Sequence, residues 1–109
     1  MVEGKEFREL MLQVVRTRMA FRRSMQRTLK KNNAGITFEM LQILSCLWHE
    51  QEDRRNKLVF LTPEGEEFKK QIRPILDQVY VHAEHIIGIE NVETMLSELK
   101  AVHNVLENI

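Results

Sequence analysis

Hydrophobic residues recur at three- and four-residue steps along most of the chain, and this period is typical of amphipathic helices. The first such segment runs from Lys5 to about Lys31 without proline or glycine. At 1.5 Å per residue, a helix of this length would be roughly 40 Å long. Residues 32–35, which tolerate left-handed backbone, are expected to end it. Its apolar positions are Phe7, Leu10, Met11, Val14, Val15, Phe21, Met25 and Leu29.

A second helix is predicted from Phe38 to about His49, with Thr37 as its N-cap. Apolar residues cover a broad arc of this segment, so the helix is expected to be central and buried. Cys46 lies in the run, and we expect a small buried hydrophobe there, since a redox-sensing thiol needs exposure and a cationic neighbour.

Two further helices are predicted after the middle of the chain. One runs from Pro63 to about Ile87, with Pro74 expected to kink it or interrupt its hydrogen bonds and Gly88 expected to end it. The other covers 90–107, with apolar residues at near-heptad spacing. These stripes either form a bundle within one subunit or pair with the helices of a second copy.

The segment between the second and third helices, Asp53–Gly65, reads as a charged turn, a short strand and a helix start. Residues 58–61 are apolar and β-favouring, and Thr62 with Pro63 is a good helix beginning. Arg54, Arg55 and Lys57 would then lie at a loop tip. A basic tip held in this way is suited to contact a phosphate backbone or a minor groove.

The same segment resembles the wing of the MarR family of bacterial transcription regulators, whose Asp-x-Arg element matches Asp53 and Arg55. The resemblance implies a mainly α, winged-helix (α+β) fold with a short β wing. It implies dimerisation helices at 1–31 and 63–109 and a remnant of the DNA-binding lobe at 36–62. In such a wing Arg55 enters the minor groove, Arg54 and Lys57 contact phosphates, and Asp53 supports the arginine.

One departure from the family is large. In the family a further helix and a recognition helix precede the first wing strand, whereas here Gln51 runs almost directly into Asp53. Either the protein is a shortened relative, or the real polypeptide contains residues that this sequence omits. An intact mass well above 13.0 kDa would support the second alternative.

The resemblance also implies a function: a homodimeric, ligand-responsive repressor that binds double-stranded DNA. The alternative is a truncated dimerisation or protein-interaction module without base-specific readout. In members of the family, small aromatic effectors bind between the dimerisation helices and the DNA-binding lobe. The corresponding candidate pocket residues here are Phe21, Met25, Met40, Leu44 and Trp48.

Composition bears on the number of domains, the cellular setting and the distribution of charge. The 109 residues suit one domain, and the single cysteine fits a reducing, cytoplasmic setting. The net charge of zero hides +5 on residues 1–61 (12 Lys/Arg, 7 Asp/Glu) and −5 on residues 62–109 (4 and 9). Seven of these cations lie between Arg16 and Lys31, on either a solvated face or a backbone-contacting patch.

Enzymatic, metal and membrane roles find little support in the sequence. There is no phosphate-binding glycine loop, nucleophile elbow or carboxylate pair, so no enzyme and no cofactor is expected. His82 and His85 are three residues apart, but a metal site needs more convergent ligands. The basic first helix lacks tryptophan and its apolar stripe is expected to pack, so membrane attachment is not expected either.

Overall fold

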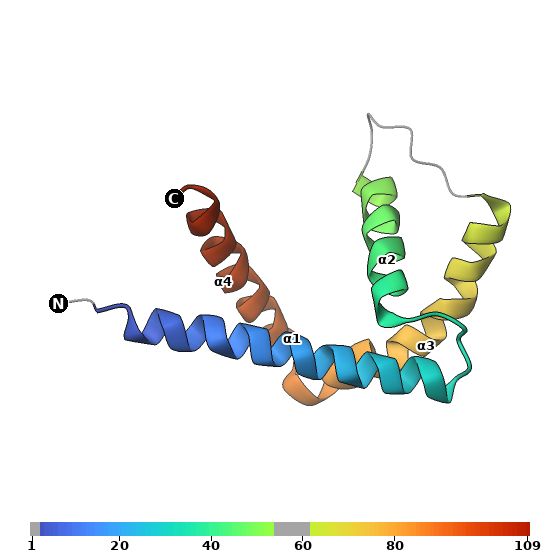
Figure 1. The fold of residues 1–109 in the computed structure, drawn as a ribbon, viewed down its shortest axis with the longest axis horizontal. Coiled ribbons are helices and arrows are strands. Elements are labelled where there is room, and N and C mark those ends of the chain that lie inside the picture. The colour runs from blue at the N-terminus through green and yellow to red at the C-terminus, as the bar shows by residue number, and fades with distance from the viewer. Residues whose placement is uncertain (1–2, 54–61) are drawn as a thin grey trace. The chain divides into compact units, whose positions relative to one another are not determined.

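The computed structural model describes residues 3–53 and 62–109, which form four helices (Figure 1). The first, α1, spans Lys5–Lys31, as predicted. It ends in a turn in which Asn33 and Gly35 adopt positive φ angles of 51° and 76°. The left-handed backbone that these residue types tolerate reverses the chain toward the next helix.

Helix α2 spans Phe38–Asp53 and so extends beyond the predicted end at His49. The Thr37 hydroxyl accepts a hydrogen bond from the Met40 backbone N–H at 3.2 Å, which confirms the predicted N-cap. No glycine or proline lies between Thr37 and Asn56 to stop the helix. Glutamate and glutamine favour helix, so the helix continues past its predicted end and reaches Asp53, the first residue of the predicted turn.

Helix α3 spans Pro63–Ile87, within the predicted limits. The Thr62 hydroxyl accepts the Gly65 backbone N–H at 3.1 Å, as its N-cap role requires. Pro74 lies inside α3, and the helix continues through it. Gly88, with φ of 98°, ends α3, and α4 follows at once as Ile89–Glu107.

The chain divides into two compact units, residues 1–76 and 77–109. The first unit holds a small apolar core to which α1, α2 and α3 all contribute. Its buried residues are Met25, Leu29, Phe38, Leu41, Trp48, Ile72 and Leu76. In the second unit the hydrophobic side chains of α3 and α4 are at least partly exposed, and α4 has no buried residue.

The predicted mixed winged-helix class is wrong for the described part of the chain. Residues 3–53 and 62–109 contain helices and short connections but no strand, so the fold there is all-α and no β wing is present. The predicted strand at 58–61 lies outside the described residues. The helical period of the remaining sequence was the stronger signal, because it extends over far more residues than the short apolar run. Among the described helices, none combines the length and apolarity needed to cross a membrane.

Candidate functional site

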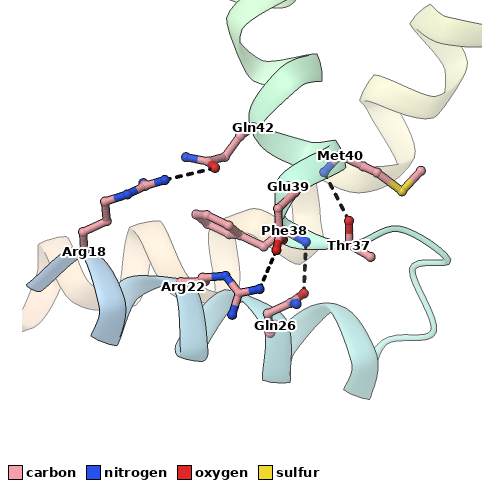
Figure 2. A network of polar contacts seen from close by, with 8 residues as sticks. All are labelled: Arg18, Arg22, Gln26, Thr37, Phe38, Glu39, Met40 and Gln42. Carbon is pink, nitrogen blue, oxygen red and sulfur yellow. Dashed lines mark hydrogen bonds and ion pairs between the residues drawn. The ribbon is translucent and has the colours of Figure 1, made fainter. Parts of the chain in front are cut away.

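Polar side chains from α1 form hydrogen bonds and an ion pair with the beginning of α2 (Figure 2). Arg22 forms an ion pair with Glu39, and Arg18 Nη2 donates to Gln42 Oε1 at 3.2 Å. Gln26 Oε1 accepts the Phe38 backbone N–H at 3.0 Å. This N–H belongs to the first turn of α2 and has no partner within its own helix, so Gln26 supplies one.

The ion pair changes the acidity of its carboxylate. Hydrogen bonding from Arg22 lowers the pKa of Glu39 below its ordinary value of 4.5, and the positive charges of Arg22 and Arg18 add to the effect. Glu39 is therefore ionised at neutral pH. Both partners are exposed, so the pair contributes little to stability but helps to fix the register of α1 against α2.

Phe38 is the centre of the contact between the two helices. Its ring is buried and meets the Phe21 ring edge to face, with centroids 5.6 Å apart and planes at 80°. The Arg18 guanidinium carbon lies 5.8 Å from the centroid of the Phe38 ring. Arg18 thus interrupts the apolar stripe of α1, yet it still packs against the core through an aromatic ring.

The residues predicted to line an effector pocket lie in different environments. Met25 is buried, Trp48 is only 7% exposed, and Phe21 and Leu44 are half-buried, whereas Met40 is 48% exposed. In the described residues Trp48 Nε1 has no hydrogen-bond acceptor, and the Lys69 ammonium lies 5.8 Å from the Trp48 ring centroid.

The described surface hollows are open and lie elsewhere. One of about 550 Å³ follows the turn between α1 and α2 and is lined by residues that include Leu29, Lys30 and Ile36. It shares none of the five predicted pocket residues. The effector pocket therefore stays a prediction from the resemblance.

The predicted DNA-contacting residues cannot be placed. Arg54, Arg55 and Lys57 lie outside the described residues, and Asp53 is the last residue of α2, where only the backbone is described. A different group of cations is well placed in α1. Arg16, Arg23, Arg27 and Lys30 are exposed, and their side chains have no hydrogen-bond or ion-pair partner among the described residues.

We call these four residues the outer cation row. Their spacing of seven, four and three residues keeps them on one face of a 3.6-residue helix. Met25 and Leu29 point into the core from the opposite side of the same helix. No acidic residue occurs between Glu9 and Glu39, so no carboxylate of α1 offsets this charge within a turn of the row. Like charges at this spacing destabilise a helix by about 0.2–0.5 kcal/mol per pair.

Apolar side chains also remain on the outside of α2. Met40, Ile43 and Leu47 share the face opposite to Phe38 and Leu41, and all three are exposed. Cys46 is exposed too, so the expectation of a buried cysteine is wrong. The sequence showed that α2 is apolar over a broad arc but not that its core face is the one containing Phe38, Leu41 and Trp48.

The second unit exposes a larger apolar surface. On α4 the residues of the predicted near-heptad stripe share one face, yet Leu96 is 52% and Leu99 45% exposed. On α3, Ile86 is 68% exposed. His82 and His85 are also exposed, and in the described residues they belong to no group of three or more potential metal ligands.

Sequence reasoning had not identified the division of the α1 cations into two sets. Arg18 and Arg22 contact α2, whereas the outer cation row faces solvent. The signal was present in the spacing, since Arg18 and Arg22 fall on the Met25 and Leu29 face and the four residues of the outer cation row fall opposite. Comparisons with protein-family models, curated proteins and solved structures found no match for this chain.

Proposed function

We propose that this protein is a helical homodimerisation module, in which the apolar faces of residues 77–109 associate with those of a second copy. The observation that carries the proposal is that α4, a helix of 19 residues, buries none of them. Its stripe of Val92, Leu96, Leu99, Val102 and Leu106 is continuous along one side. Surface helices normally bury such a stripe, because helix stability in proteins comes mainly from packing it.

The exposed side chains of the second unit support association on a large scale. Eleven large hydrophobic residues in 77–109 are at least 42% exposed. Large exposed apolar surfaces mark sites of protein–protein association.

Sedimentation equilibrium over a wide concentration range tests this proposal. A dimer has twice the 13.0 kDa chain mass and dissociates on dilution. A mass of one chain at all concentrations would refute the proposal. An intact mass by mass spectrometry, made on the same sample, distinguishes a dimer from a polypeptide longer than this sequence.

A second candidate function is a DNA-binding regulator of the MarR type, in which the dimer would present two DNA-contacting surfaces to two half-sites about 34–36 Å apart. The observation in its favour is the group of cations Arg54, Arg55 and Lys57 in the segment that resembles the family. Binding to DNA selected from a random pool tests it. Arg55→Ala should weaken binding to the selected sequence, and an unchanged affinity would remove Arg55 from the interface.

A further inference from the structure

We propose that the outer cation row of α1 (Arg16, Arg23, Arg27 and Lys30) binds the phosphate backbone of a nucleic acid without reading its sequence. The proposal uses neither the segment that resembles a wing nor the dimer interface. It rests on the division of the α1 cations into two sets. Arg18 and Arg22 interact with Gln42, Glu39 and Phe38, whereas the side chains of the row have no hydrogen-bond or ion-pair partner among the described residues.

The geometry of the row fits a regular polyanion. From Arg16 to Lys30 the helix advances roughly 21 Å, which is about the axial rise of six nucleotides of one DNA strand. Three of the four residues are arginines, whose guanidinium groups can donate two parallel hydrogen bonds to a phosphate. The like charges of the row repel one another, and among the described residues its side chains have no hydrogen-bond or ion-pair partner, so folding does not explain its charge.

Two other polyanions fit less well. A membrane surface would require a continuous free apolar face beside the cations. Between Arg16 and Lys30, however, Met25 and Leu29 are buried in the core and Phe21 is half-buried, which leaves Met19 as the one exposed large apolar side chain. The acidic second unit of another copy has a net charge of −5 from six acids and one lysine in 77–109. However, Glu90, Glu93, Glu98 and Glu107 are distributed around α4 and do not form a matching row.

The chain offers a matched pair of variants for the test. Arg23→Gln with Arg27→Gln removes two cations of the outer row, and Arg18→Gln with Arg22→Gln removes two inner cations. Both pairs consist of arginines four residues apart on the same helix. Their effects on net charge and composition are identical, so any difference in binding reports on the direction in which the side chains point.

Binding to a fluorescent duplex of random sequence is measured by anisotropy between 50 and 200 mM salt. Four phosphate contacts predict a slope of log K against log salt of about −3.6, which is roughly a 150-fold loss over this range. The outer-pair variant should retain two contacts, a slope of about −1.8 and a loss of roughly 12-fold. The inner-pair variant should keep the original slope. Circular dichroism verifies that this variant is folded.

Four results would overturn the proposal. Equal slopes in the two variants would show that the row has no special role, and so would absence of binding by the unmodified chain. Binding to vesicles of anionic lipid without binding to DNA would assign the row to a membrane. A change in the dimer dissociation constant for the outer-pair variant, without DNA binding, would assign it to a second copy.

Discussion

Leu99 of α4 offers the sharpest test of the proposed dimer. Its side chain is 45% exposed in the single chain and lies at the centre of the α4 stripe. Leu99→Ala shortens it and Leu99→Asp places a charge at the same point. Because α4 buries no residue within its own chain, neither change removes a contact from the core of the first unit.

The size of the effect follows from the area that remains exposed. Complete burial of a leucine side chain contributes about 1.5–3 kcal/mol. Nearly half of the Leu99 surface is left for the partner, which corresponds to about 0.7–1.4 kcal/mol per copy. A two-fold interface contains the residue twice, so Leu99→Ala should weaken dimerisation by about 1.4–2.8 kcal/mol, or roughly 10- to 100-fold. Leu99→Asp should have a larger effect, since burying an unpaired carboxylate costs several kcal/mol more.

Sedimentation equilibrium of the two variants and of Ser97→Asp measures the three dissociation constants. Ser97 is exposed on the opposite side of α4, so this control adds the same charge to the same helix outside the stripe. We expect the control to dimerise as the unmodified chain does. Equal dissociation constants for Leu99→Asp and Ser97→Asp would refute the assignment of the stripe to the interface.

Two further predictions concern the first unit. Because the pKa of Glu39 is lowered in the fold, its ion pair with Arg22 contributes fully above about pH 4.5 and is lost as the pH falls through the lowered value. Glu39→Gln should therefore make urea unfolding less sensitive to pH on the acid side, and an unchanged pH dependence would contradict this. Phe38→Ala, which empties the centre of the α1–α2 contact, should lower the free energy of unfolding by about 3–5 kcal/mol, measured through Trp48 fluorescence. A loss below 1 kcal/mol would show that the core closes around the cavity.

The helices were predictable because each has a local signal. The period of apolar residues gave α1 and α3 their limits, and Thr37 and Thr62 marked helix beginnings by capping chemistry. The prediction of a β wing depended on a short apolar run and on the resemblance. Short apolar runs are ambiguous between strand and helix, and the extension of α2 to Asp53 shows how helix formers continue where no breaker intervenes.

The contacts between helices were not predictable in the same way. The pairs Arg18–Gln42 and Arg22–Glu39 join residues 24 and 17 positions apart. Periodicity shows which side chains share a face of one helix, but not which face meets another helix. The α2 helix illustrates this, since both of its sides are apolar and only one is buried. The solvent-facing direction of the outer cation row became clear only after the core face of α1 was known.

The apolar stripe of α1 is continuous in sequence but is covered over only part of its length. Met25 and Leu29 are buried, whereas Phe7, Leu10 and Val14 are 43%, 41% and 37% exposed. The part of α1 whose apolar residues are left exposed has marginal stability in water without packing. If the second copy covers it together with α4, both segments should gain protection from hydrogen exchange as protein concentration rises, while the α1–α2 contact should not change. If protection from hydrogen exchange does not depend on protein concentration in any of these helices, dimerisation does not stabilise them. That result would refute the proposed coupling.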